Sequence, residues 1–293
     1  MNGRQRVTSI LFAGLVASSI QTIAVETNHC EIQHDIEYGR VGDLSLKLDL
    51  YLPRRKARAP LIVWVHGGAW RSGSKKSMPL SKLVEEGYPI ASVDYRLSTQ
   101  ARFPAQIHDI KAAVRFLRSH GERWQLSTKK ILVAGDSAGG HLAALVGVSN
   151  GNSELEGDIG NDRNQSSNVQ GIMSFYGAAN LTTILKQSTP HGLEVRVPAL
   201  DLLLGGQPEA VPELARLASP AFHVDRRDPP LLLLHGDQDP QMPINQSIEL
   251  LGAYQKAKAP VQLEVVHGAG HGGAMFYDEE RLAIVKSFLR RYF

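Results

Sequence analysis

Short apolar runs alternate with segments of helical periodicity over most of this chain, from about residue 45 onward. The strongest apolar runs lie at 61–65, 131–134, 231–234 and 261–266. Short runs that are rich in branched side chains and followed by glycine-rich turns are typical of buried β-strands. Further strands are expected at 44–52, 90–95 and 171–176, and helices at 105–119, 138–149 and 279–291. This alternation predicts an α/β fold with a mostly parallel central sheet covered by helices on both faces.

Two segments interrupt the alternation. Residues 150–168 are rich in Asn, Gly, Asp and Ser and have no periodicity, which predicts an exposed loop. Residues 178–220 carry five prolines and short helical signals between two expected strands, so we expect a small cap insertion there. The chain of 293 residues has no internal repeat and no linker. We therefore expect one domain over residues 25–293.

The first 24 residues differ in character from the rest of the chain. Arg4 and Arg6 precede an apolar stretch at 9–20, and small residues follow near residue 24. This is the order of a secretory signal peptide, and the stretch is shorter than the roughly 20 residues of a membrane-spanning helix. We expect residues 1–24 to be a signal peptide and the mature protein to be periplasmic or secreted. We expect no segment of the protein to stay inserted in the membrane.

The charge balance argues against one class of partner. The chain has 32 Lys and Arg against 29 Asp and Glu, and loss of the leader removes two arginines, leaving 30 against 29. With a net charge near +1 and no stripe of basic and aromatic residues, we expect no nucleic-acid partner.

Cys30 is the only cysteine of the chain, so no intramolecular disulfide can form. A monomer or a homodimer is expected.

Reactive residue types gather where the expected strands end. Ser137 stands in a Gly-Asp-Ser-Ala-Gly sequence at 135–139, directly after the strand at 131–134 and before a helix. A G-x-S-x-G sequence in that setting is typical of a nucleophile elbow, in which the flanking glycines tolerate a sharp turn. A serine hydroxyl needs a base, a partner that orients the base, and donors for the oxyanion that it creates. Ser137 is the candidate nucleophile, and the other roles are sought at other strand ends.

A glycine-rich turn supplies candidate oxyanion donors. A His-Gly-Gly-Ala-Trp sequence at 66–70 follows the strand at 61–65. Backbone N–H groups in such a turn can point toward a developing oxyanion. We expect the donors to be Gly67, Gly68 and Ala138. His66 is expected to order the loop rather than to transfer protons.

The acid and the base are expected after Ser137, in the order acid and then histidine. Asp237 and Asp239 both follow the strand at 231–234. We favour Asp239, because it lies in the turn proper, and keep Asp237 as the alternative. Two histidines follow the last expected strand. The second, His271, is the expected general base, and His267 is the alternative.

Other chemistries find little support in the sequence. The chain has 11 histidines, but no His-x-x-x-His pair on an expected helix and no pair of cysteines that would indicate a metal site. No P-loop sequence follows a strand, so a nucleoside triphosphate is not implied. We expect neither a metal nor a cofactor.

These residues resemble the α/β-hydrolases similar to hormone-sensitive lipase, and their esterase and lipase relatives of the BD-FAE-like group. The resemblance runs from about Tyr38 to the C-terminus and rests on the sequences at 66–70, 94–96, 103–109, 135–140, 235–239 and 270–271. It implies an α/β-hydrolase fold with a catalytic triad and an oxyanion hole. The triad positions are those of Ser137, Asp239 and His271, and the oxyanion positions are those of Gly67, Gly68 and Ala138. One departure is Ala69, where many lipase-like members have a third glycine.

The resemblance also implies an activity. Carboxylic ester hydrolysis through an acyl-enzyme is the expectation, with a small-molecule ester as substrate. Members related to prolyl oligopeptidases cleave peptides, so a serine peptidase is the alternative. A catalytically inactive binding protein on this fold would lack part of the triad or of the oxyanion loop, and no part is missing here. The identity of the ester does not follow from the residues.

Overall fold

The computed structural model describes residues 24–26, 30–54 and 59–293. The expected signal peptide therefore lies outside the described residues, except for Ala24, which begins strand β1 (Ala24–Glu26).

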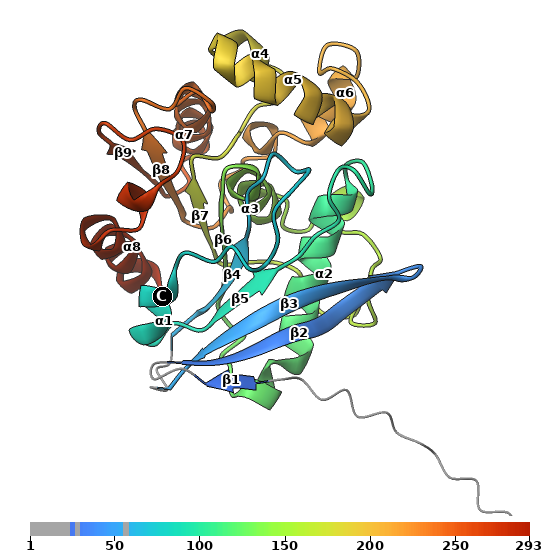
Figure 1. Ribbon diagram of the computed structural model, residues 1–293, viewed down its shortest axis with the longest axis vertical. Coiled ribbons are helices and arrows are strands. Elements are labelled where there is room, and N and C mark those ends of the chain that lie inside the picture. The colour runs from blue at the N-terminus through green and yellow to red at the C-terminus, as the bar shows by residue number, and fades with distance from the viewer. Residues whose placement is uncertain (1–23, 27–29, 55–58) are drawn as a thin grey trace, which may run out of the picture.

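Nine strands form one sheet in the described ranges, in the order β1-β2-β3-β5-β4-β6-β7-β8-β9 (Figure 1). The strands that follow β1 are β2 (Cys30–Val41), β3 (Leu44–Pro53), β4 (Leu61–Val65), β5 (Ile90–Val93), β6 (Ile131–Asp136), β7 (Gly171–Phe175), β8 (Leu231–Gly236) and β9 (Val261–Val266). From β1 to β5 along this order, neighbours are antiparallel. From β5 to β9 they are parallel. The carboxyl ends of the parallel strands therefore meet at one edge of the sheet, where open α/β sheets build their ligand sites.

A hydrophobic core lies on each face of the sheet, and the side chains of β4 alternate between the two. Leu61, Val63 and Val65 pack in one core, together with residues of α2 (Ala105–His120), α3 (Ala138–Val148) and α7 (Asn245–Ala257). Ile62 and Trp64 pack in the other, together with residues of α1 (Ser81–Glu85) and α8 (Glu279–Tyr292). Because both faces are covered, the parallel strands are continuous apolar runs. The expected fold class is confirmed.

The expected elements are present, each ending within two residues of its expected bounds. The hydrophobic pattern does not predict β2 or α7. In β2 most side chains are only partly buried and its pairing with β3 is irregular, so the strand mixes polar and apolar positions without a clear period. In α7 only four of the thirteen residues are buried, and two of these are Gln246 and Ser247, so the buried face is narrow and partly polar.

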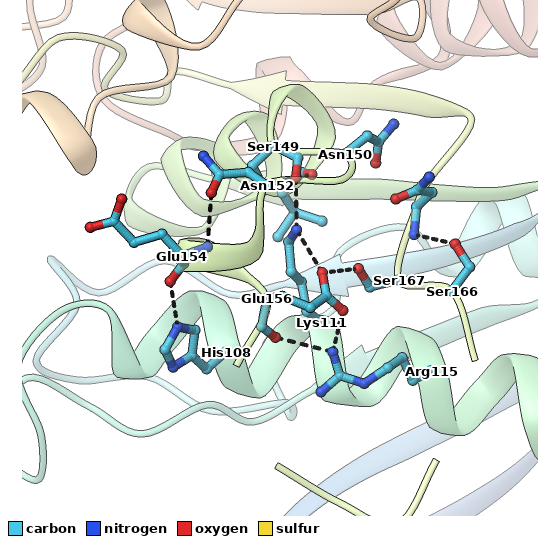
Figure 2. A network of polar contacts seen from close by, with 12 residues as sticks. His108, Lys111, Arg115, Ser149, Asn150, Asn152, Glu154, Glu156, Ser166 and Ser167 are labelled. Atoms are coloured by element: carbon cyan, nitrogen blue, oxygen red, sulfur yellow. Dashed lines mark hydrogen bonds and ion pairs between the residues drawn. The ribbon is translucent and has the colours of Figure 1, made fainter. Parts of the chain in front are cut away.

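The segment 150–168 is anchored to α2 by buried charges (Figure 2). Lys111 and Arg115 of α2 are buried, and both form ion pairs with Glu156. The Lys111 Nζ–Glu156 Oε2 distance is 3.1 Å, and the Ser167 hydroxyl donates to the same carboxylate oxygen at 2.6 Å. The expected loop is therefore fixed against α2. One of its polar residues, Glu156, neutralises the buried cations Lys111 and Arg115.

The segment 178–220, expected to be a cap, contains three helices. They are α4 (Ile184–Gln187), α5 (Pro190–Leu204) and α6 (Pro212–Leu217), and they lie together at one end of the molecule (Figure 1). The hydroxyl of Thr189, at the start of α5, donates to the carbonyl oxygen of Pro240. This contact places α5 beside the turn that follows β8.

Candidate active site

Ser137 occupies a sharp turn between β6 and α3. Its backbone φ is 51° and its ψ is −115°, a conformation that costs a residue with a side chain energy and that clusters at functional sites. The helix after it crosses β4 at close range, and a Cβ atom on Gly139 would lie 2.0 Å from the carbonyl oxygen of Val65. Only glycine fits there. The geometry is that of a nucleophile elbow at the carboxyl end of a parallel strand.

Ser137, His271 and Asp239 form a continuous chain of hydrogen bonds. The Nε2 atom of His271 lies 2.9 Å from the Oγ atom of Ser137, and its Nδ1 atom lies 2.7 Å from Oδ2 of Asp239. Three segments that are far apart in the sequence supply these residues: the β6–α3 turn, the turn after β8 and the turn after β9. The structure thus brings together the three residues favoured from the sequence.

The carboxylate of Asp239 is fully buried and held in one orientation. Its Oδ1 atom accepts the backbone N–H groups of Gln241 and Met242, at 2.9 and 2.8 Å. Burial opposes the charge of this carboxylate, but the adjacent His235 and His271 side chains outweigh burial and hold its pKa well below the ordinary range. Asp239 is therefore ionised at neutral pH and accepts the Nδ1 proton of His271.

The alternative acid and base pair with each other instead. The Nδ1 atom of His267 lies 2.8 Å from Oδ2 of Asp237, and the His267 side chain is 83% exposed. Asp237 also accepts the backbone N–H of Gly268, which closes the turn after β9. Neither residue has a hydrogen bond to Ser137 within the described residues. Their geometry is that of a surface pair that shapes the turn.

The N–H groups that are free in the loop at 66–70 differ from the expected oxyanion donors. The backbone N–H of Gly67 donates to Oδ1 of Asp136 at 2.8 Å, so it is not available to a substrate. This geometry corrects the expectation for Gly67. The N–H groups of Gly68, Ala69 and Ala138 donate to no other group among the described residues. Gly68 and Ala69 also line the cleft beside Ser137, which makes Ala69 the replacement candidate.

A polar network that the sequence did not indicate supports this loop. The hydroxyl of Tyr176 lies 3.3 Å from Oδ2 of Asp136 and 3.0 Å from the hydroxyl of Tyr277. Its ring meets the ring of His271 edge to face, with centroids 5.0 Å apart. Burial raises the pKa of Asp136. The tyrosines come from the ends of β7 and of a short 3-10 helix, Ala274–Phe276, and no local motif marks them.

Two buried histidines, His141 and His235, pack beside the site and contact the segments that form it. His141 accepts the indole N–H of Trp70 at 3.1 Å and donates to the carbonyl oxygen of Ala218 at 2.6 Å. It therefore joins the 66–70 loop to the end of the 178–220 segment. Burial lowers the pKa of His141 to about 4, so the ring is neutral at neutral pH. His235 lies beside Asp239, with its Nε2 atom 3.5 Å from Oδ2.

Ser137 and the residues around it line a cleft of about 440 Å³. Its walls come from the 66–72 loop, the β6–α3 turn, the turn after β8 and the 271–273 turn. A volume of this size suits a small organic ligand.

Over the described ranges, no three His, Cys, Asp or Glu residues gather closely enough to hold a metal ion. In that same part of the chain, none of the helices has the length and apolar character needed to span a bilayer.

Comparison with known proteins places the chain in a family. The family model described as BD-FAE matches residues 48–254, more than half of the chain. The chain belongs to the BD-FAE family. The expected resemblance is confirmed. The BD-FAE match includes Ser137 and Asp239 and ends before His271, whose position is given by the structure.

Relatives of this BD-FAE chain include esterases of known sequence. It is 32% identical over 224 residues to Esterase LipC of Mycobacterium tuberculosis, covering 73% of this chain and 53% of LipC. It is 28% identical over 259 residues to isoprenylcysteine alpha-carbonyl methylesterase ICME of Arabidopsis thaliana, covering 86% of this chain and 59% of that protein. The chain spans about half the length of the curated relatives it matches.

Solved structures extend this similarity to three dimensions. A truncated carbohydrate esterase from gut microbiota superposes with a TM-score of 0.81 at 29% identity, over 92% of this chain and 98% of that one. Esterase 2 of Thermogutta terrifontis with propionate bound superposes with a TM-score of 0.71 at 26% identity, over 90% of this chain and 94% of that one. The BD-FAE chain therefore has the α/β-hydrolase fold.

Proposed function

We propose that this protein hydrolyses carboxylic esters, with Ser137 as nucleophile, His271 as general base and Asp239 as the partner that orients the base. One observation carries the proposal: the hydrogen bonds from Ser137 through His271 to the buried carboxylate of Asp239. The family membership supports it, and so do relatives and solved structures named as esterases.

The first half of the reaction forms an acyl-enzyme. Because Asp239 accepts the proton on Nδ1, the Nε2 atom of His271 has a free lone pair facing Ser137. Nε2 takes the hydroxyl proton as Oγ attacks the carbonyl carbon of the ester, and the imidazolium is stabilised by the adjacent carboxylate. Nε2 then gives that proton to the departing alcohol oxygen, which leaves the acyl group on Oγ.

The second half returns the serine. A water molecule gives a proton to Nε2 of His271 and attacks the acyl carbon, the Ser137 oxygen leaves with the proton, and the carboxylic acid is released. Each half passes through a tetrahedral intermediate with a negatively charged oxygen. The N–H groups of Gly68, Ala69 and Ala138, which are free in the described structure, are the donors we assign to that oxygen.

Replacement of the nucleophile tests the proposal. Ser137→Ala should lower the turnover of p-nitrophenyl acetate by about 10⁴-fold to 10⁶-fold, as in other serine triads. Ser77→Ala is the matched control, because that hydroxyl is exposed and bonds to none of the described residues. Both variants should have unchanged circular dichroism spectra. Undiminished turnover by the folded Ser137→Ala protein would contradict the assignment.

A matched ester and amide separate an esterase from a serine peptidase. The two reactions use the same triad, but an amide has a poorer leaving group, and a peptidase overcomes this through added contacts to the peptide. We expect kcat/KM to favour the ester of an amino acid strongly over its anilide. Comparable values for both substrates would favour the peptidase.

We further propose that the protein is exported after removal of residues 1–24, on the strength of the leader pattern alone. N-terminal sequencing of the protein from the extracytoplasmic fraction should give a first residue near position 25. A full-length protein in the cytoplasm would refute this.

A further inference from the structure

Arg71 is a cation in the cleft wall whose charge is not matched. It follows Trp70 in the loop that lines the cleft, and Gln241 lines the same cleft. Within the described residues its guanidinium group has no hydrogen bond and no ion pair. Asp136 also lines the cleft, but its carboxylate already accepts the N–H of Gly67 and faces the hydroxyl of Tyr176.

A second arginine lies behind the same wall. Arg196 of α5 is fully buried, and both of its terminal guanidinium nitrogens have no hydrogen-bond partner among the described residues. Its Nε–H donates to the carbonyl oxygen of Gln241, at 3.4 Å. Its guanidinium carbon lies 6.0 Å from the ring centre of Trp70, which His141 holds in place.

The two guanidinium groups interact electrostatically with each other, and Asp239 is the carboxylate near Arg196. Asp239 is already committed to His271 and to two backbone N–H groups. Burying a cation such as Arg196 without a committed partner is costly. Arg71, a second and partly exposed cation at the same wall, raises the local positive potential further. A substrate that brings its own negative charge would lower that cost.

We propose that this cleft accepts esters that carry a carboxylate, with Arg71 in contact with the carboxylate and Arg196 adding positive potential from behind the wall. The inference rests on the proposed ester hydrolysis. The carboxylate could belong to the acyl part or to the alcohol part of the ester, and Arg71 would form the same charge-assisted hydrogen bonds with either.

Two pairs of substrates test the inference and distinguish the two positions. For the acyl part, mono-p-nitrophenyl adipate is compared with p-nitrophenyl hexanoate, which has an acyl chain of the same length and no charge. For the alcohol part, p-acetoxybenzoate is compared with p-acetoxybenzamide. Each pair yields a ratio of kcat/KM values, charged over neutral, so differences in the amount of active enzyme cancel.

Arg71→Gln should lower that ratio by about 10-fold for at least one pair, the loss expected for one charge-assisted hydrogen bond in a partly exposed site. Lys76→Gln is the control, because Lys76 is an exposed cation outside the cleft and its loss changes the net charge equally. The wild-type ratio should also fall as sodium chloride is raised from about 0.01 M to about 0.5 M, since salt screens a partly exposed pair.

A ratio that Arg71→Gln and Lys76→Gln leave unchanged for both pairs would overturn the inference. In that case the neutral esters would still be hydrolysed, so the proposed function would stand. If the wild-type protein hydrolysed none of the four esters, the proposed function would fail and the inference would fail with it.

Discussion

Asp239→Asn should remove nearly all catalysis while it keeps the fold. The Oδ1 atom of Asp239 accepts two backbone N–H groups, and only a carbonyl oxygen can replace it there. An asparagine would therefore place its oxygen at that position and its NH₂ group toward Nδ1 of His271. Nδ1 would then have to accept a hydrogen bond, and the ring proton would move to Nε2. In this tautomer Nε2 cannot take the proton of Ser137.

The magnitude follows from the lost base. A serine enzyme with the wrong histidine tautomer loses about 10⁴-fold in kcat, or about 5.5 kcal/mol of transition-state stabilisation. Stability should change far less, because the backbone hydrogen bonds to Oδ1 are kept. Initial rates with p-nitrophenyl acetate give the activity, and urea unfolding monitored by fluorescence gives the stability.

Asp237→Asn is the matched control for this prediction. Asp237 stands two positions earlier in the same turn and pairs with His267 at the surface. Its substitution should leave kcat within about 2-fold of the wild-type value. If Asp237→Asn lost activity and Asp239→Asn kept it, the acid would be misassigned and the reasoning about the tautomer would fall.

Two further predictions concern stability. Glu156→Gln should lower the free energy of unfolding by about 2–3 kcal/mol, because it leaves buried Lys111 and Arg115 uncompensated; Glu154→Gln, an exposed acid in the same segment, should have no measurable effect in the same urea titration. His141 has a folded-state pKa of about 4 against an ordinary value of 6.5, so as the pH falls between these values the unfolded chain binds a proton that the folded protein excludes. Stability should fall by about 3 kcal/mol over this range, and a His141→Gln variant should show a shallower dependence on pH than the wild-type protein; equal slopes would contradict the prediction.

Much of the fold could be predicted from the sequence because the strands are buried on both faces. Runs such as 61–65 are apolar at every position, and such runs between helical segments have few arrangements other than a covered parallel sheet. The strand β2 escaped prediction because its side chains are mostly half-buried and its register with β3 is irregular. The same physical reason applies to α7, which buries only a narrow stripe.

In the candidate site too, residues marked by local sequence pattern could be predicted, and features set by tertiary packing could not. Ser137, Asp239 and His271 could be predicted because each follows a strand that local pattern reveals, and strand ends of a parallel sheet converge. The use of the Gly67 N–H by Asp136 could not, since it depends on the orientation of one carboxylate 69 positions away. The sequence does not mark Arg196 as buried, because an arginine on a helix is ordinarily a solvated residue. Its burial is decided by packing against Trp70 and Gln241, which are distant in the sequence.

Covalent labelling of the nucleophile tests the central claim most directly. The purified protein is treated with a fluorophosphonate that phosphonylates activated serines, then digested and analysed by mass spectrometry. We predict one stoichiometric adduct, located on Ser137, with loss of esterase activity in step with labelling, and no adduct in the Ser137→Ala and Asp239→Asn proteins over the same time. An adduct on another serine, or full labelling of folded Ser137→Ala, would contradict the account.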